Sequence, residues 1–257
     1  MFFSWPIAWV ELFLLVVFRV AGVIALMPVL GGRGMPARAK LLLALLITLL
    51  LLPALPVADW PLGGRGLWSW LGLAAHEVLL GVLLGFAAQV PILAMQMAGE
   101  LLGLQMGFGI ASVIDPESGG QENIMAGMLR NVALLLFLVF NGHHVVLTAM
   151  ADSLRTLPPG ALSLSPDLLG EGLRLVGHLF ELGLRLGAPA MAALLLSEVG
   201  LGLIARTVPQ MNIFIVGFPL KIGLGFALLG ITLPSVLVLF RQEVGALAGV
   251  LARLAAP

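Results

Sequence analysis

Apolar runs without a charged residue follow one another along this chain. An α-helix needs roughly 20 apolar residues to cross a bilayer. Four uncharged runs of about that length occupy residues 41–58, 78–99, 131–151 and 222–240. Two further segments, residues 5–30 and 173–205, are long enough but carry charges. The pattern predicts about six hydrophobic helical segments, with loops near residues 31–40, 59–70, 115–123 and 152–170.

The composition defines the class of protein. Apolar residues make up 60% of the 257 residues and charged residues 10%, and the mean hydropathy is +1.12, far from soluble averages. We therefore expect an all-α membrane protein with one membrane-embedded domain over residues 1–257, because no long polar linker divides it. The first segment is expected to be a retained span, since no basic residue precedes it and no small-residue cleavage site ends it.

Loop charges and tryptophans predict how the first two segments are oriented. Arg33, Arg38 and Lys40 fall in one short loop without an acid, which the positive-inside rule places in the cytoplasm. The N-terminus is then outside. Five tryptophans would share the outer interface as an aromatic belt: Trp5, Trp9, Trp60, Trp68 and Trp70.

The charges near the C-terminus conflict with six full crossings of the membrane. Six crossings place the C-terminus outside, although the tail carries Arg241 and Arg253 against one acid, Glu243. One re-entrant segment would remove this conflict, and residues 103–120 are the best candidate.

The stretch GLQMGFGIASVIDPESGG, residues 103–120, breaks the apolar helical pattern. Gly109 weakens a helix, and Pro116 disfavours helical geometry at Asp115. Irregular backbone at membrane depth survives only where protein buries it or where it lines a watery cavity. We expect the segment to face a cavity, with Met106, Phe108, Ile110 and Val113 near it and Asp115, Glu117 and Glu122 at a watery end. For residues 115–120 a plain polar loop is an equal alternative.

Glycines recur at helical spacing. Gly99, Gly103 and Gly107 are four residues apart, and so are two pairs, Gly81 with Gly85 and Gly183 with Gly187. On a helix each set makes a smooth face that another backbone can approach closely. Ordinary close helix packing is the favoured interpretation.

One helix is expected to carry a polar stripe. At intervals of three and four residues follow Asp167, Glu171, Arg174, His178, Glu181 and Arg185. Charges at mid-membrane cost about 2.5 to 3.5 kcal/mol each, so this face is expected to meet water, headgroups or protein, with Glu181 pairing to Arg185. A helix lying flat on the membrane is the alternative.

Enzyme, metal and nucleic-acid chemistry have little support. The pairs His143–His144 and His76–Glu77 lack metal-ligand spacing, and no nucleophile elbow or phosphate-binding loop occurs. No metal or cofactor is expected. The net charge of zero gives no basic field for nucleic acid, and the absence of cysteine excludes disulfides.

Four stretches together resemble the FliR/SctT family of type III secretion export-gate proteins, in the same order and over nearly the whole chain. They are RGMPARAK (33–40), GELLGLQMGFGIASVIDPESGGQ (99–121), NGHHVVLTAMADSLRTLP (141–158) and VPQMNIFIVGFPLKIGLG (208–225). The flagellar branch fits better than the virulence branch.

The resemblance implies a flagellar export gate in the bacterial inner membrane, at the flagellar basal body. Its partners would be FliP-like and FliQ-like gate subunits and an FlhB-like export-switch protein, and unfolded flagellar subunits would pass through it. The family fold of bent helical hairpins, partly raised above the membrane plane, would undo a count of six spans.

The resemblance also implies roles for particular residues. A channel plug would comprise Gln105, Met106, Gly107, Phe108 and Ile110, with Asp115 and Pro116 setting its turn. A bent hairpin important for assembly would contain Pro209, Asn212, Gly217, Pro219 and Lys221, in which Asn212 satisfies backbone groups and Lys221 finds a carboxylate or carbonyl partner. The stripe residues Arg174, His178, Glu181 and Arg185 would face partner subunits or the channel.

Two other functions stay open at this point. In a small-solute or ion transporter, residues 103–116 would form the substrate site, and Glu181 or Asp115 would relay protons. Such a chain alone would show saturable flux. A membrane scaffold without a pore would tolerate changes in the plug but not in the glycine faces.

Overall fold

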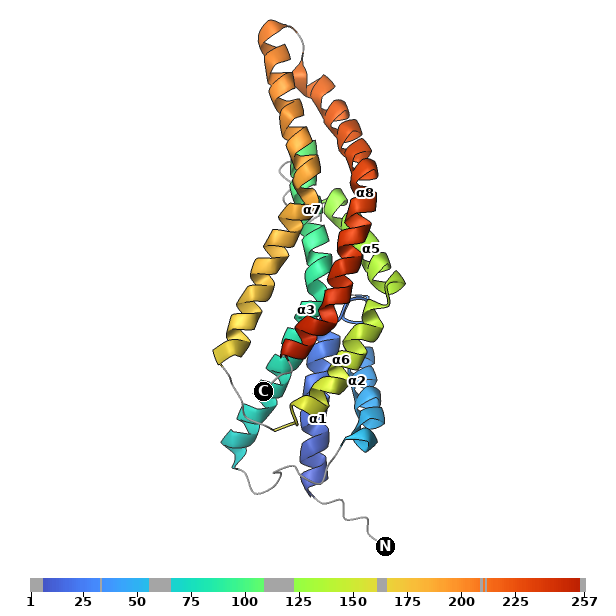
Figure 1. Ribbon diagram of the computed structural model, residues 1–257, viewed down its shortest axis with the longest axis vertical. Helices are drawn as coiled ribbons and strands as arrows, with labels where there is room; N and C mark the ends of the chain where they lie inside the picture. Colours follow the sequence, from blue (N-terminus) through green and yellow to red (C-terminus); the bar gives the residue numbers. More distant parts are fainter. Residues whose placement is uncertain are drawn as a thin grey trace. The chain divides into compact units, whose positions relative to one another are not determined.

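The computed structural model describes residues 7–32, 34–55, 66–108, 123–160, 166–208, 210 and 212–254. Within these residues the chain is helical and contains no strand, as expected (Figure 1). Its elements are α1 (Ile7–Leu26), α2 (Ala37–Leu51), a 3-10 turn η1 (Leu52–Ala54), α3 (Leu67–Met106), α5 (Ile124–Val139), α6 (Gly142–Thr156), α7 (Pro166–Thr207) and α8 (Ile213–Leu254).

The chain divides into two compact units. Unit 1 comprises residues 1–90, 137–176 and 244–257, and unit 2 comprises residues 91–136 and 177–243. The helices α3, α7 and α8 each run through both units, and in α3 the division falls at Pro91. A single domain over residues 1–257 stays a prediction.

Four helices of the described residues are long and apolar enough to span a membrane, and the bent pair α5 and α6 would make a fifth. The six expected hydrophobic segments are all present as helices, but two of them are not single straight spans. The run at residues 41–58 forms only the 15-residue α2 before Pro53 turns it into η1, and 15 residues at about 1.5 Å each fall short of a bilayer core. The run at residues 131–151 is broken at Asn141, whose φ of 55° ends helical geometry.

Helix ends also differ from the expected loops. Arg38 and Lys40 lie in the first turn of α2, and Trp68 and Trp70 lie in the first turn of α3. Each helix therefore begins about one turn before the end of the loop expected from the sequence. Arg33, Trp5 and Trp60 lie outside the described residues, so the membrane orientation stays a prediction.

The core of unit 1 is built on a close crossing of α1 and α3. A β-carbon added at Gly81 would lie 2.2 Å from the Arg19 carbonyl oxygen, and one at Gly85 would lie 2.8 Å from that of Val23. On the facing helix, a β-carbon at Gly22 would lie 2.8 Å from the Val78 carbonyl oxygen. The prediction that Gly81 and Gly85 form a close-packing face is confirmed.

In unit 2, α3 is approached as closely by α5 and α7. A β-carbon at Gly99 would lie 2.7 Å from Cα of Ala126 on α5, and one at Gly183 would lie 3.1 Å from the Ala94 carbonyl oxygen. The second pair member, Gly187, faces Ala98 at 3.6 Å. The glycine faces thus serve helix packing, as expected.

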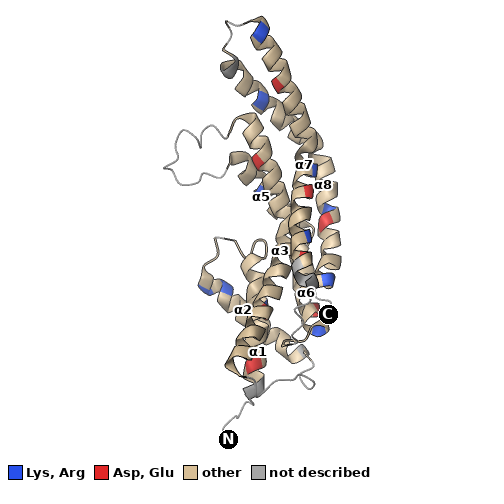
Figure 2. Ribbon diagram, turned by 90° about the vertical axis from the view of Figure 1, so that its left-hand side faces the viewer, with Lys and Arg blue, Asp and Glu red and all other residues tan. Residues whose placement is uncertain are grey.

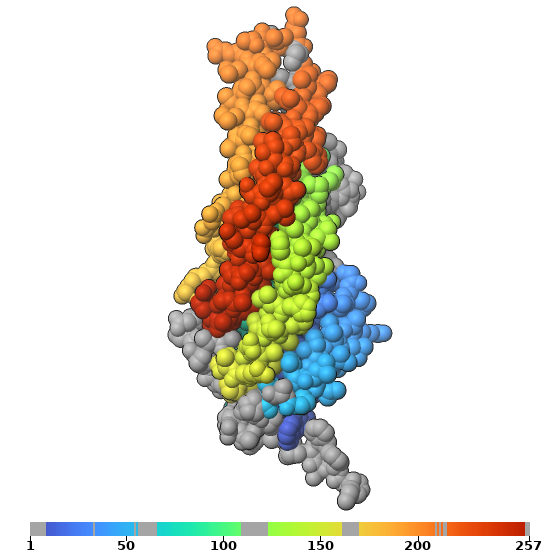
Figure 3. Space-filling model, turned by 45° about the vertical axis from the view of Figure 1, so that its right-hand side comes forward, coloured from blue at the N-terminus to red at the C-terminus, as the bar shows by residue number. Residues whose placement is uncertain are grey.

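The helices α7 and α8 pair antiparallel on either side of residues 208–212, and much of their apolar surface is uncovered (Figures 1 and 3). Only 17% of the most apolar stretch of α7 and 11% of that of α8 is buried, against 50% for α1 and 61% for α3. Charged residues are sparse along the helices (Figure 2). An exposed apolar surface of this extent calls for lipid or another protein.

Candidate functional site

The helix α3 does not stop at Gly103, where the sequence pattern breaks, but at Met106. The Phe108 amide donates to the Gly103 carbonyl at 2.9 Å, and the Gly107 amide donates to that of Leu104 at 3.1 Å. These two bonds, with Gly107 at φ 93°, form a Schellman cap. A residue with a β-carbon is strained at this φ, so glycine at position 107 determines where α3 ends.

The end of α3 is covered by α8. Met106 is fully buried, and its Sδ lies 2.6 Å from the place that a β-carbon at Gly225 would take. The ring of Phe218 lies 2.5 Å from the corresponding place at Gly107. All four residues belong to unit 2. Phe218 of α8 thus packs on Gly107 of α3, and Met106 of α3 packs on Gly225 of α8, so each close contact requires a glycine in one of the two helices.

The start of α5 is tied to the same stretch of α3. The Asn123 Oδ1 accepts a hydrogen bond from the Met125 amide at 3.0 Å, which caps the N-terminus of α5. The Asn123 side chain also covers Gly103, where a β-carbon would lie 2.2 Å from its Oδ1. The two helices that flank residues 109–122 are thus held together at their ends.

The predicted plug residues fall into three groups. Gln105 and Met106 are helical residues of α3 and precede the break expected after Gly107. Gly107 and Phe108 form the turn that follows. Ile110, Asp115 and Pro116, together with Val113, Glu117 and Glu122, lie outside the described residues. Gln105 Oε1 is buried without a hydrogen-bond partner.

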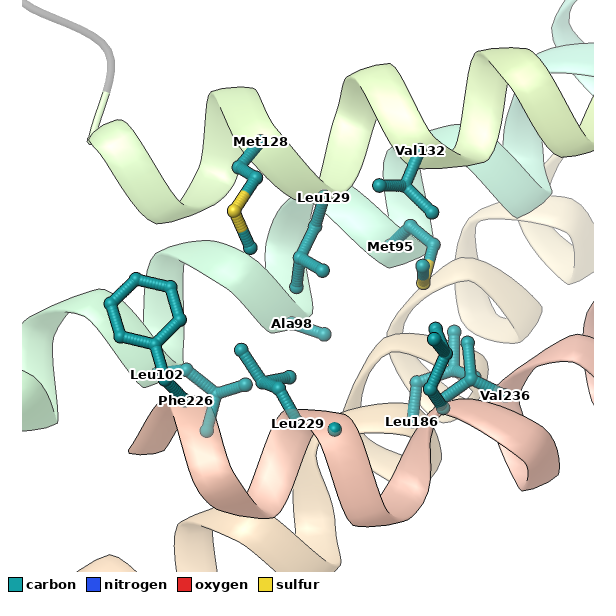
Figure 4. A pocket seen from close by; sticks show the side chains of 12 residues that line it. Met95, Ala98, Leu102, Met128, Leu129, Val132, Leu186, Phe226, Leu229 and Val236 are labelled. Carbon is teal, nitrogen blue, oxygen red and sulfur yellow. The ribbon is translucent and has the colours of Figure 1, made fainter. Parts of the chain in front are cut away.

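An apolar pocket of about 260 Å³ lies one to three turns before the end of α3, within unit 2 (Figure 4). Met128, Leu129 and Val132 enter it from α5, opposite Phe226 and Leu229 of α8 (Figure 4). Met95, Ala98 and Leu102 of α3, Leu186 of α7 and Gly230, Leu233 and Val236 of α8 complete the lining. The space between α3, α5 and α8 is therefore incompletely filled.

Unit 1 contains a buried ion pair that the sequence analysis missed. Arg19 of α1 donates to the carboxylate of Glu77 of α3 through Nε at 2.6 Å and Nη2 at 3.1 Å, and both side chains are 1% exposed. Arg19 Nη1 also donates to the carbonyl oxygens of Ser153 and Leu157, each at 2.9 Å. The Gly160 amide donates to Glu77 at 3.1 Å.

This network connects α1, α3, the end of α6 and the chain that follows it. Arg19 donates to two carbonyl groups at the end of α6: that of Leu157, which follows the last helical residue, and that of Ser153, which also accepts from the Leu157 amide at 3.0 Å. The signal in the sequence is Arg19 itself, because an arginine inside an apolar run requires a buried partner. Nothing in the order of residues selects Glu77 among the acids as the partner of Arg19.

The polar stripe is helical, as predicted, but its pairing differs. Arg174 bonds Glu171 at 2.9 Å, and His178 bonds Glu243 of α8 at 2.8 Å. No ion pair joins the described side chains of Glu181 and Arg185, so that expected pair is wrong. Both side chains point away from the core and are exposed. Asp167 is in α7, but its side chain is not described.

The residues assigned to a bent hairpin lie mostly inside α8. Gly217, Pro219 and Lys221 are helical residues of α8, and residues 208, 210 and 212 of the connection to α7 lie outside both helices. Lys221 contacts the carboxylate of Glu198 on α7, a partner of the kind expected. The Asn212 carbonyl accepts from the Ile215 amide at 3.1 Å. Pro209 lies outside the described residues, and a role in assembly stays a prediction.

The histidine pair of α6 shows ring contact and no metal geometry. The rings of His143 and His144 are 4.4 Å apart. Among the described side chains, no group of three His, Asp or Glu residues lies close enough to bind a metal ion.

Long apolar helices, glycine-mediated crossings and a large uncovered helical pair define an all-α integral membrane protein. Comparison with known proteins specifies the class. The family described as "Bacterial export proteins, family 1" matches residues 10–247.

Individual relatives agree with this match. The flagellar biosynthetic protein FliR of Escherichia coli (strain K12) is 36% identical over 231 residues, which cover 90% of this chain and 87% of the relative. FliR of Pectobacterium carotovorum subsp. carotovorum is 37% identical over 91% and 89% of the two chains, and FliR of Bacillus subtilis (strain 168) is 32% identical over 90% and 89%. The chain belongs to the FliR family of bacterial export proteins.

Proposed function

We propose that this chain is a non-enzymatic subunit of the flagellar type III export gate in the bacterial inner membrane. In this role it forms part of the channel for unfolded flagellar subunits and supplies the plug that obstructs it. Membership of the FliR family supports the flagellar assignment. The structural observation that carries the proposal is the uncovered pair α7 and α8, of which 17% and 11% of the apolar stretches are buried.

Lipid alone is a poor cover for this surface. Arg174, Glu181 and Arg185 are exposed on α7 beside apolar residues. Each such charge at the bilayer centre costs about 2.5 to 3.5 kcal/mol. Neighbouring helices of FliP-like, FliQ-like and FlhB-like subunits, or water in a channel, would receive these charges at lower cost. The surface therefore favours a subunit inside a helical assembly.

The plug is assigned to the chain from Gln105 onward, through Met106, Gly107, Phe108 and Ile110 to the turn at Asp115 and Pro116. Methionine and phenylalanine close a pore with soft apolar contacts that do not bond to a passing chain. The Schellman cap at Gly107 gives this segment a defined starting point.

Native mass of the complex tests the assignment. We expect extraction in mild detergent, from cells that also produce the neighbouring export proteins, to yield a particle of several hundred kilodaltons with FliP-like and FliQ-like subunits. A reproducible monomer or homodimer with saturable solute flux would replace this proposal with the transporter.

Cysteine labelling locates the covered surface, since the chain has no cysteine of its own. Leu196→Cys and Ile231→Cys, at positions 73% and 75% exposed, should react with a maleimide in the isolated chain and be protected in the complex. Leu194→Cys, at a position 1% exposed, is the matched control and should stay unlabelled in both. Equal labelling of Leu196→Cys and Ile231→Cys in both states would contradict coverage by partners.

Deletion tests the plug. Because Met106 and Gly107 belong to the end of α3, the deletion should begin after Phe108 and remove residues 109–113. Cells with this variant should leak ions while the complex still assembles. Unchanged conductance in an assembled complex would remove the plug assignment.

A further inference from the structure

The contact of α8 with the end of α3 goes beyond ordinary packing. Phe218 and Gly225 are seven residues apart, which places them on the same face of α8. They meet two consecutive residues, Gly107 and Met106. A β-carbon at Gly107 would lie 2.5 Å from Cδ1 and Cε1 of Phe218, so the ring lies directly over the turn that ends α3.

The second contact involves a residue with no free space around it. Met106 is 0% exposed, and its Cγ lies 3.0 Å from the place of a β-carbon at Gly225. An added methyl group at residue 225 would have to displace a buried side chain. Both contacts therefore fix the last turn of α3 against one helix.

The seam between α3 and α8 is hollow just before this point. Leu102 and Phe226 line the apolar pocket, each within one turn of Met106 and Gly225. Atoms that line an unfilled space lose dispersion contacts on that side. The attachment of α8 to α3 in this part of the seam thus depends on the two contacts at its end.

The other end of the connection between α3 and α5, at the start of α5, is held by different contacts. Asn123 caps α5 and covers Gly103 of α3, and it takes no part in the contacts with Phe218 and Gly225. Movement of α8 would release the chain after Gly107 and leave the start of α5 in place.

From these contacts we infer that Met106, Gly107, Phe218 and Gly225 form a latch. Through Phe218 and Gly225, α8 holds the end of α3 while the gate is closed. Export requires these two contacts to part, while the packing of α3 on α7 stays intact. This inference rests on the proposed export function. It adds to that function two positioning residues on α8, Phe218 and Gly225, that control the gate.

A reversible cross-link tests the latch in the assembled complex. The pair Met106→Cys with Gly225→Cys is close enough for a disulfide, whose β-carbons are roughly 3.5 to 4.5 Å apart. Oxidation should abolish export of a flagellar subunit in proportion to the fraction cross-linked, and reductant should restore it. Undiminished export from fully cross-linked complexes would overturn the latch.

The matched control joins α3 to α7. The β-carbon of Ala98 lies 3.6 Å from the place of a β-carbon at Gly187, so Ala98→Cys with Gly187→Cys should also form a disulfide. Export should continue when this pair is oxidised. If both cross-links stop export, a general movement of the helices is required and the local latch is wrong.

The complex that carries Met106→Cys and Gly225→Cys could fail to export even when its cysteines are reduced. In that case side-chain variants test the latch instead. Phe218→Ala should raise the ion leak of resting cells by about 5- to 30-fold, the population shift expected from losing one such contact. Phe218→Leu, which retains apolar volume, should leak less.

The deletion of residues 109–113 separates the two proposals. A leak from the deletion without a leak from Phe218→Ala would leave the plug in place and refute the latch. No leak from the deletion would refute the plug itself, and the latch with it.

Discussion

Arg19 and Glu77 are joined side-on by two hydrogen bonds, at a place where each side chain is 1% exposed. The pair connects α1 to α3 and, through the Ser153 and Leu157 carbonyls, holds the end of α6. Burying two charges is costly, and the hydrogen bonds to three backbone groups offset part of that cost. The pair thus determines how three segments of unit 1 are placed.

Glu77→Gln should lower the free energy of unfolding by about 3 kcal/mol, because it leaves the Arg19 charge buried without a carboxylate. Denaturant titration of the detergent-solubilised chain measures this change. Glu181→Gln removes an exposed carboxylate from α7 and should stay within about 0.5 kcal/mol of the parent. Equal effects of the two substitutions would show that the buried pair contributes nothing.

Gly81→Ala should destabilise unit 1 by about 1 to 3 kcal/mol, since its β-carbon would lie 2.2 Å from the Arg19 carbonyl oxygen and force α1 and α3 apart. Gly72→Ala is the matched control on the same helix, with nothing within 4 Å of the added carbon. It should be neutral or stabilise the helix by about 0.5 to 1 kcal/mol. Thermal unfolding of both variants compares them, and similar melting temperatures would contradict the close crossing.

Asn123→Ala should cost about 1 kcal/mol, because the Met125 amide loses its cap at the start of α5. Asn123→Asp keeps an accepting oxygen and should recover most of the loss. Hydrogen exchange of the first turn of α5 reports the effect directly. Faster exchange in both variants alike would mean that packing on Gly103, and not the cap, holds this turn.

His178 and Glu243 should show a coupling of about 1 kcal/mol in a double-mutant cycle of His178→Ala and Glu243→Ala. The bond of 2.8 Å joins α7 to α8 while both side chains are partly exposed, which limits its strength. A cycle with Glu243 and the exposed Arg185, which it does not contact, is the control and should give no coupling. Additive effects at His178 and Glu243 would remove this bond from the forces that hold the pair of helices.

Much of the candidate site could be foreseen from residue types. Glycine spacing predicted which faces of α3 and α7 come close to other helices, and the break after Gly107 predicted the end of α3 to within one turn. Lys221 was expected to find a carboxylate or a carbonyl, and it contacts Glu198. These features depend on local rules. Glycine adopts a positive φ more readily than other residues, and a charged side chain within the membrane needs a partner.

One error overlooked a local signal: Asn141 and Gly142 form an Asn-Gly step, and the left-handed φ of Asn141 divides α5 from α6. Another error arose where a distant segment decides. Glu181 and Arg185 have ideal spacing for a pair, yet His178 bonds Glu243 on the next helix and the other two stay unpaired with each other. Side-chain pairing on a helix depends on what the neighbouring helix presents, and spacing along one helix carries no such information.

Hydropathy and the spacing of glycines and charges were sufficient to determine that this is a helical membrane protein with a break after α3, because those properties act within a few turns of one helix. The tertiary structure alone decided which acid neutralises Arg19, which side chains of α8 cover Met106 and Gly107, and how much of α7 and α8 is left uncovered. Each of these depends on contacts between residues far apart in the sequence. The order of residues limits such contacts, but only the packing of the helices selects among them.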